Sequence, residues 1–321
     1  MSISVFSLLQ SIILARALFV AANLNIAEHL ATKPMSVSEI AAITNVDAPS
    51  LQRLLYFLEL NEIFKKNDEN YYLTEFSQLM CGNNQNTIKP FLLHDDETRW
   101  NSYGNLGYSI KTGKASFDHL YGISYFDYLK NNPILSSRFN EAMTIISAQE
   151  DEVIAKTIHF TNIVADIGGG TGQLINQIAN NNNIDKSILF DLPEAIDQAN
   201  NLPIHCSKVS GSFFEPIAFT ADIFILKRIL HDWDDEKALN ILKNISGAMT
   251  RSSKLYIIDG ILDYSKDKAV LAAIDLALLA VFQGKERTKL EFKTLIKAAG
   301  LEIVSIQTLD NIICAIECKK G

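Results

Sequence analysis

The sequence predicts an α/β protein with a doubly wound sheet in its C-terminal half and a smaller, mostly helical domain before it. Two observations predict this fold class. From residue 158 onward, short apolar runs alternate with helical patterns, which is typical of a largely parallel sheet. A chain of 321 residues is also long for a single core, so two domains are expected. The expected strands are 163–168, 187–192, 204–210, 221–228 and 254–261, followed by 302–319 as a hairpin with an antiparallel end.

Residues 3–24 form the first expected element, a helix that is apolar on more than one face. It contains Gln10, Arg16 and Asn23, and it lacks the charged start and the cleavage site of a signal peptide. A membrane span and an intramolecular core helix would also be apolar. A helix of this kind at a terminus more often packs against another subunit, so we expect a homodimer and no membrane association.

Residues 36–80 have the outline of a winged helix: two helices and then a two-stranded hairpin. Ser36 and Glu39 form a capping box that opens a helix through Ile43. A turn over 45–49, a helix over 50–60 and strands near 63–65 and 71–74 follow. The functional interpretation would be DNA binding, but this segment carries three basic and seven acidic residues. A phosphate-binding face needs the opposite sign, so we expect a structural winged helix and no nucleic-acid partner.

Residues 99–149 are helical and rich in aromatic side chains, which are usually core residues. Some of them could instead line an apolar pocket. Trp100 and Phe126 are the candidates that we assign to substrate binding. The four cysteines do not form a metal pattern; Cys314 and Cys318 lie roughly 13 Å apart on a strand, too far for a disulfide. Reduced thiols predict a cytoplasmic protein.

The glycine-rich turn after the first expected strand of the sheet is the most informative motif. The apolar run from Ile163 ends in Asp166, and Gly168, Gly170 and Gly172 follow at alternate positions. Glycine there lets backbone amides approach a ligand at the edge where open α/β sheets bind nucleotides. The spacing G-x-G-x-G differs from the dinucleotide pattern G-x-G-x-x-G. Together with Asp166 it suits a ligand with a cationic amine, such as S-adenosylmethionine, although another nucleotide ligand or a structural turn remains open.

A second acid ends the next expected strand. Asp191 lies 23 residues after Gly168, where a carboxylate can accept hydrogen bonds from both ribose hydroxyls. The structural alternative is a helix cap before Glu194. The glycine turn favours the ligand-binding interpretation.

His231 follows the fourth expected strand and is the candidate general base, because its ordinary pKa is near neutral. Asp232 is expected to cap the next helix, with Asp235 three residues on. The acids around His231 diverge about a helix start, so no metal site is expected. Asp259 and Glu286 fall on the same sheet edge, where an acid could orient the imidazole and stabilise its charged form.

With these motifs in place, the chain resembles the plant-type, acetylserotonin-like family of S-adenosylmethionine-dependent O-methyltransferases, including bacterial members. The resemblance covers nearly the whole length. The matching segments, in order, are 139–143, 166–172, 191–193, 226–227, 231–233 and 284–288.

The resemblance implies a class I methyltransferase domain with a Rossmann-like sheet over 151–321. It also implies a winged-helix dimerisation domain over 1–95 and a helical linker over 96–150 that lines the substrate pocket. His231 would be the base, positioned by Glu286 and Asp259, with Asp232 on the substrate side. The implied cofactor-binding positions are Asp166, Gly168, Gly170, Asp191, Leu192, Ser212, Phe213, Lys227, Met143 and Ser147. Ser212 departs from the family, which usually has an acid there; serine can hydrogen-bond but carries no charge.

The function expected from these residues is methylation of a hydroxyl, phenolic in character, on a small aromatic metabolite. Two alternatives stay open. The first is an enzyme of the same fold that catalyses a different reaction, and the second is a small-molecule-sensing regulator built on the winged helix.

Overall fold

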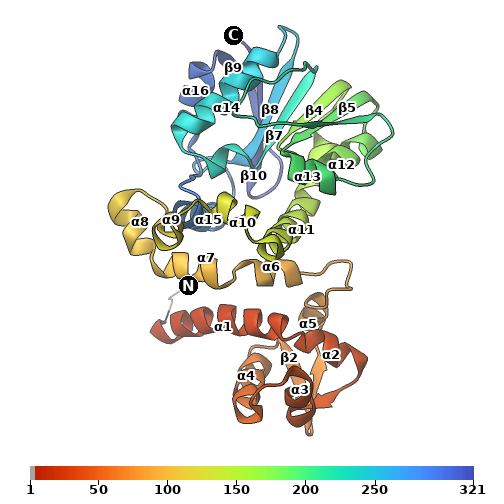
Figure 1. Ribbon diagram of the computed structural model, residues 1–321, viewed down its shortest axis with the longest axis vertical. Helices are drawn as coiled ribbons and strands as arrows, with labels where there is room; N and C mark the ends of the chain where they lie inside the picture. Colours follow the sequence, from red (N-terminus) through yellow and green to blue (C-terminus); the bar gives the residue numbers. More distant parts are fainter. Residues whose placement is uncertain (1–3) are drawn as a thin grey trace. The chain divides into compact units, whose positions relative to one another are not determined.

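The computed structural model describes residues 4–321, which form two compact units. The first contains residues 4–100 and 129–146, and the second contains 101–128 and 147–321 (Figure 1). Helices α7 (Glu97–Gly104), α10 (Tyr125–Lys130) and α11 (Pro133–Thr157) each contribute residues to both units.

The first unit is a winged helix preceded by two further helices. Its small sheet has the order β1-β3-β2 and is antiparallel. The expected capping box is confirmed: Ser36 caps α3, and the Glu39 carboxylate accepts from the Ser36 amide. Helix α4 begins at Ala48 rather than at residue 50, because Asp47 caps it and Pro49 is tolerated in the first turn. The elements are α1 (Val5–Asn23), α2 (Ile26–Thr32), β1 (Met35–Ser36), α3 (Val37–Thr44), α4 (Ala48–Leu60), β2 (Phe64–Asn67), β3 (Asn70–Leu73), α5 (Glu75–Leu79), α6 (Lys89–His94) and α7 (Glu97–Gly104).

Helix α1 leaves most of its apolar surface exposed within this unit. Phe6 is 83% exposed, Leu9 58% and Ile13 48%, while Ala17 and Ala21 are buried. Among the described residues, α1 is the helix long and apolar enough to cross a membrane. Length and composition alone are weak evidence for a span, because the core helix of a soluble protein and a signal sequence meet the same criterion.

The second unit is built on a seven-stranded sheet with the order β6-β5-β4-β7-β8-β10-β9. Strands β6, β5, β4, β7 and β8 are parallel, and β10 is antiparallel to both of its neighbours, as expected for a terminal hairpin. The strands are β4 (Asn162–Ile167), β5 (Ile184–Asp191), β6 (Cys206–Ser210), β7 (Ile223–Lys227), β8 (Lys254–Gly260), β9 (Leu301–Thr308) and β10 (Ile313–Lys320).

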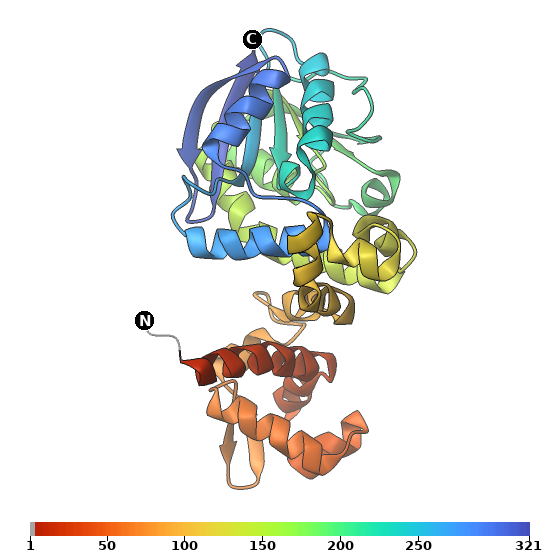
Figure 2. The same cartoon turned by 90° about the vertical axis from the view of Figure 1, so that its left-hand side faces the viewer.

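Helices cover both faces of this sheet, so its central strands are apolar on both sides. Phe224 and Leu226 of β7 pack on one face with α14 and α16, while Ile223 and Ile225 pack on the other with α11 and α12. Figure 2 shows α14 and α16 lying over the strands of the sheet. The helices of this unit are α8 (Leu106–Thr112), α9 (Ser116–Tyr121), α10 (Tyr125–Lys130), α12 (Gln173–Asn181), α13 (Pro193–Gln198), α14 (Asp235–Ala248), α15 (Lys268–Val281) and α16 (Lys289–Ala298).

The strand order reverses at β4, which pairs with β5 on one side and with β7 on the other. Ligands of open α/β sheets bind outside the carboxyl ends of the strands at such a reversal. The turn after β4 therefore lies where the fold provides a binding crevice.

A short 3₁₀ turn, η1 (Leu230–Asp232), carries His231 and is held by a buried arginine. Arg287 is fully buried, and its guanidinium donates to the Leu230 carbonyl (2.7 Å), the Trp233 carbonyl (2.8 Å) and Asp235 (3.0 Å). Gly284 allows the close approach, since a Cβ there would lie 2.1 Å from the His231 carbonyl oxygen. The segment 284–287 thus fixes the backbone on both sides of His231.

The expectation that Asp232 caps the following helix is wrong. Asp234 is the N-cap of α14, and its carboxylate accepts from the Lys237 amide at 2.8 Å. Asp232 is the last residue of the 3₁₀ turn, so the N-cap of α14 lies two residues later than expected. Asp232 is left beside His231, with 3.6 Å between its Oδ1 and the imidazole Nε2.

We predict that Arg287→Lys destabilises the fold by about 3 kcal/mol, because a single ammonium leaves buried carbonyl groups without donors. Urea unfolding followed by circular dichroism measures this change. Arg251→Lys, the same substitution on an exposed turn, is the matched control. A loss below about 0.5 kcal/mol for Arg287→Lys would show that the buried hydrogen bonds are not what holds the turn.

Candidate functional site

The turn after β4 has the geometry of a ligand cradle. Gly168 and Gly170 have φ values of 74° and 58°, in the left-handed region that favours glycine. The Gly168 amide donates to the Phe190 carbonyl at 2.8 Å, and the Gly170 amide donates to Asp191 Oδ2 at 2.7 Å. These bonds tie the turn to the end of β5 and bring both predicted acids to the same edge.

Asp166 is a buried carboxylate with one oxygen unsatisfied. Its side chain is at the end of β4, and no group among residues 4–321 hydrogen-bonds to its Oδ2. Burial, reinforced by the neighbouring Asp151, raises the pKa of Asp166 to about 7. A buried acid in this state is stabilised by a cationic partner. The ammonium group of an amino acid fits that requirement.

Asp191 is already oriented by backbone amides. Its Oδ2 accepts from Gly170 and its Oδ1 accepts from Leu192 at 2.6 Å. Burial raises its pKa, and these two hydrogen bonds oppose that rise. A carboxylate oxygen can accept more than one hydrogen bond, so both oxygens retain capacity for ligand hydroxyls.

Lys227 is the last residue of β7 and Arg228 follows it; both are paired with consecutive acids on α11. Lys227 Nζ lies 2.5 Å from Asp151 and 3.3 Å from Glu150. Arg228 Nη2 lies 2.6 Å from Glu150, and its Nη1 lies 3.6 Å from Glu286. The implied cofactor contact of Lys227 stays a prediction. In this structure its ammonium group offsets the negative charges of Glu150 and Asp151.

His231 is held by Glu286. The imidazole Nδ1 lies 2.9 Å from Glu286 Oε1, and 4.0 Å from Asp259 Oδ1. The Glu286 amide donates to Asp275 on α15 at 2.8 Å, which fixes the backbone behind the carboxylate. With Nδ1 directed at Glu286, Nε2 is the nitrogen that remains for a proton-transfer partner.

Three acids surround the imidazole and control its charge. Burial disfavours the imidazolium, but Asp232, Asp259 and Glu286 outweigh burial and raise the pKa of His231 to about 9. Asp259 is completely buried, and neither of its carboxylate oxygens has a hydrogen-bond partner among the described residues. Burial and the nearby Glu286 raise its pKa to about 7. The three acids therefore favour the charged form of the His231 imidazole.

Aromatic rings lie beside the 3₁₀ turn that carries His231. Phe126 stacks on Trp233 with 5.7 Å between ring centroids and lies 5.2 Å from Phe282. Phe213 and Phe214 make T-shaped contacts with Trp233, with 6.2 and 4.9 Å between ring centroids. The expected core role holds for Phe117 and Tyr125, which are buried, whereas Phe126, Trp233 and Phe282 are only half-buried.

The remaining predicted residues are divided between the two units. Ser212 follows β6, and its hydroxyl accepts from the Phe214 amide at 3.2 Å. Leu192 is partly exposed next to Asp191, and Ser147 lies on α11 one turn before Glu150. Trp100 and Met143 belong to the first unit, where the Arg16 guanidinium lies over the Trp100 ring.

The sequence reasoning missed four charged residues of the site: Glu150, Asp151, Arg228 and Arg287. One signal was available. Two consecutive cations close an apolar strand at 227–228, and buried cations require partners. Their partners are 76–78 residues away in sequence, so the pairing could not be assigned without the fold.

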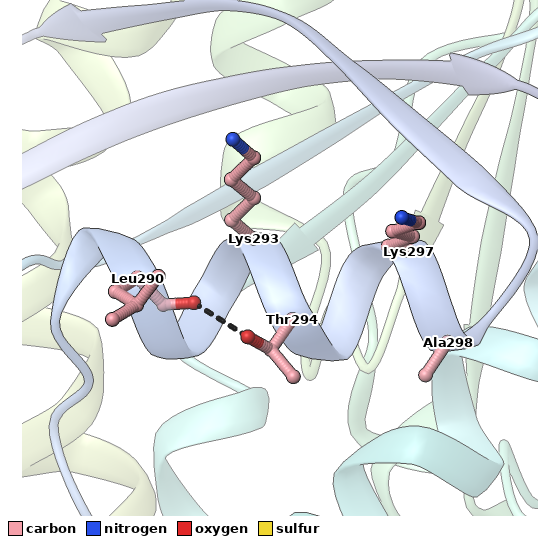
Figure 3. A pocket seen from close by; sticks show the side chains of 5 residues that line it. All are labelled: Leu290, Lys293, Thr294, Lys297 and Ala298. Atoms are coloured by element: carbon pink, nitrogen blue, oxygen red, sulfur yellow. Dashed lines mark hydrogen bonds between the residues drawn. The ribbon is translucent and has the colours of Figure 1, made fainter.

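The described residues offer neither a metal site nor, in the hollow on α16, a second ligand site. Residues 4–321 contain no group of three or more His, Cys, Asp or Glu side chains placed to hold a metal ion. A hollow on the outer surface of α16 is lined by Leu290, Lys293, Thr294, Lys297 and Ala298 (Figure 3). Its residues come from one helix, and the Thr294 hydroxyl is already bonded to the Leu290 carbonyl at 3.0 Å.

Comparison with known proteins relates this geometry to an enzyme family. Residues 103–302 match the O-methyltransferase domain, and residues 6–83 match the O-methyltransferase dimerisation domain. The chain is 29% identical over 313 residues to the phenazine O-methyltransferase PhzM of Lysobacter antibioticus; the match covers 95% of this chain and 92% of that protein.

Solved structures agree. The mitomycin 7-O-methyltransferase MmcR superposes with a TM-score of 0.93 at 27% identity, covering 99% of this chain and 97% of MmcR. The O-methyltransferase NcsB1 from neocarzinostatin biosynthesis superposes with a TM-score of 0.86 at 26% identity, and the match covers all of both chains. That structure contains S-adenosylhomocysteine and 1,4-dihydroxy-2-naphthoic acid. These matches confirm the expected fold class, the methyltransferase activity and the S-adenosylmethionine cofactor. Since the first domain match alone spans more than half of the chain, this protein belongs to the O-methyltransferase family.

Proposed function

We propose that this protein methylates a hydroxyl group, phenolic in character, of a small aromatic metabolite, with His231 as the general base. The observation that carries the proposal is the His231–Glu286 pair at 2.9 Å. The Glu286 carboxylate accepts from Nδ1–H, so that Nε2 bears the lone pair. Nε2 can then take the hydroxyl proton as the oxygen attacks.

The cofactor supplies a methyl group on a sulfonium, which is electrophilic enough to react with an oxygen nucleophile. The chain's residues bind and orient the reactants. Asp166 offers its unsatisfied oxygen to an ammonium group, and Asp191 offers its carboxylate to ribose hydroxyls. Correct placement of two reactants is worth several kcal/mol, and proton removal by His231 adds about 10²–10⁴-fold.

An aromatic acceptor is supported by two independent observations. The half-buried rings of Phe126, Trp233 and Phe282 stack near the base and offer flat apolar surface. The relatives are named for acceptors of this kind, among them a phenazine and 3-amino-4-hydroxybenzoate.

The direct test is transfer of a labelled methyl group from S-adenosylmethionine across a panel of phenols, catechols and hydroxyquinones. Label in an ether product is the expected result. Consumption of an acceptor while the label stays on the cofactor would instead indicate a non-methylating enzyme of the same fold.

We predict that His231→Ala lowers kcat by at least about a hundredfold while cofactor affinity stays within a few-fold. His205→Gln, at an exposed histidine, is the matched control and should leave kcat unchanged. Because the base must be neutral, kcat/KM of the parent should rise with pH through the pKa that the three acids raise to about 9. Near-normal turnover of His231→Ala would show that placement alone drives the reaction.

We predict that S-adenosylhomocysteine binds more tightly as pH rises from 6 to 8. Asp166 must be ionised to pair with the ligand's ammonium, and its pKa is raised to about 7 in the free protein. The ionised fraction therefore grows roughly tenfold over this range. Calorimetric titration at pH 6, 7 and 8 measures the change. In Asp166→Asn, binding should be weaker and lose this dependence; an equally steep dependence in the variant would assign it to another group.

We predict that the protein is a homodimer assembled through α1, whose apolar side chains are exposed in the single chain. The double variant Phe6→Glu, Leu9→Glu should be monomeric in light scattering coupled to size exclusion, because buried carboxylates oppose association. Ile204→Glu, at a side chain that is 96% exposed in the other unit, is the control and should stay dimeric. A dimer that survives the double variant would place the interface elsewhere.

A further inference from the structure

Arg228 occupies a position that the catalytic proposal above does not use. It is the residue after β7, and its backbone is in the left-handed region at φ 55°, which a non-glycine residue rarely adopts. Its amide donates to the Ile258 carbonyl at 2.9 Å, so the conformation is held by the neighbouring strand. A strained backbone conformation of this kind persists only where the surrounding structure holds it, and such residues cluster at functional sites.

The Arg228 guanidinium bridges two buried carboxylates on different elements. Nη2 lies 2.6 Å from Glu150 on α11, and Nη1 lies 3.6 Å from Oε1 of Glu286. Glu286 Oε1 is the same oxygen that meets His231 Nδ1. Arg228 and His231 therefore face the same carboxylate oxygen, Arg228 as an ion-pair partner at 3.6 Å, while Arg228 donates a hydrogen bond to Glu150.

We propose that Arg228 is a positioning residue for the catalytic base, which holds the Glu286 carboxylate toward His231 and offsets the negative charge around the imidazole. The proposal rests on the proposed role of His231 and extends it by one charged group. Without a cation at this place, three carboxylates would face the imidazole with little compensation.

The charges around the imidazole come from several elements. Asp232 lies on η1, Asp259 on β8 and Glu286 on the segment after α15. The Asp275 carboxylate, on α15, accepts a hydrogen bond from the Glu286 amide. The cations are Arg228 at the end of β7 and Arg287, which contacts the backbone of the 3₁₀ turn.

These charges predict a direction for the titration of His231. Burial disfavours the charged guanidinium, but Glu150 and Glu286 raise the pKa of Arg228 above its ordinary value, so it stays protonated throughout the working range. A fixed positive charge beside Glu286 disfavours the imidazolium. Removing that charge should therefore raise the pKa of His231 further and leave less neutral base at neutral pH.

The experiment compares Arg228→Gln with Arg228→Lys in the full chain. His231 is titrated by NMR of ¹³C-labelled histidine, with its signal assigned from His231→Gln, and kcat/KM is measured against pH. In Arg228→Gln, both midpoints should move up by roughly one pH unit, and kcat/KM at pH 7 should fall roughly tenfold. In Arg228→Lys the His231 midpoint should lie close to that of the parent, because lysine keeps the positive charge. Arg251→Gln, the same charge change on an exposed turn, should change neither.

Glu150→Gln is a second variant, for which the expected shift of the His231 midpoint has the opposite sign. It removes a negative charge and leaves Arg228 paired with Glu286 alone, so the His231 midpoint should move down. This variant keeps the proposal testable if Arg228→Gln does not fold.

The outcomes separate the two proposals. A folded Arg228→Gln protein with an unmoved His231 midpoint, or a Glu150→Gln midpoint that does not fall, would overturn the role of Arg228 even if turnover drops. Normal turnover of His231→Ala would instead overturn His231 as the base, while the NMR titration would still report whether Arg228 controls the imidazole charge.

Discussion

The hydrogen bond between His231 and Glu286 depends on burying several carboxylates at one sheet edge. Burial alone would neutralise such acids or unfold the site, so each needs a donor or a cation. Arg287 and Gly284 fix the backbone around His231, Asp275 fixes the backbone of Glu286, and Arg228 faces the shared oxygen. The geometry that we propose for catalysis is thus set by groups that need not touch either reactant.

The two parts of the candidate site are joined at one place in the fold. Consecutive acids on α11, Glu150 and Asp151, meet consecutive cations at the end of β7, Arg228 and Lys227. Arg228 faces Glu286 and the base, while Lys227 is one of the charges that act on Asp166. The cations that face Asp166 and Glu286 are therefore held by the same two elements, α11 and β7.

Local sequence signals predicted which side chains lie at the carboxyl edge of the parallel strands. Asp166, Asp191 and His231 each follow an apolar run, and the parallel sheet brings such ends to one edge. The helix cap at Asp234 was missed because a 3₁₀ turn of three residues intervenes, and no periodicity marks so short an element. Arg228 and Glu150 were missed for a different reason: their pairing depends on how α11 crosses the sheet, which only the tertiary structure specifies.

The serine at position 212 is consistent with this charge balance. Its hydroxyl makes the hydrogen bond to the Phe214 amide that shapes the turn after β6, and a carboxylate could do the same. The adjacent Gly211 amide donates to the Asp191 carbonyl at 2.9 Å, so this turn is attached to the end of β5. Asp166 and Asp191 already have raised pKa values through burial. Serine therefore preserves the turn without adding a further negative charge at a sheet edge that already carries these two acids.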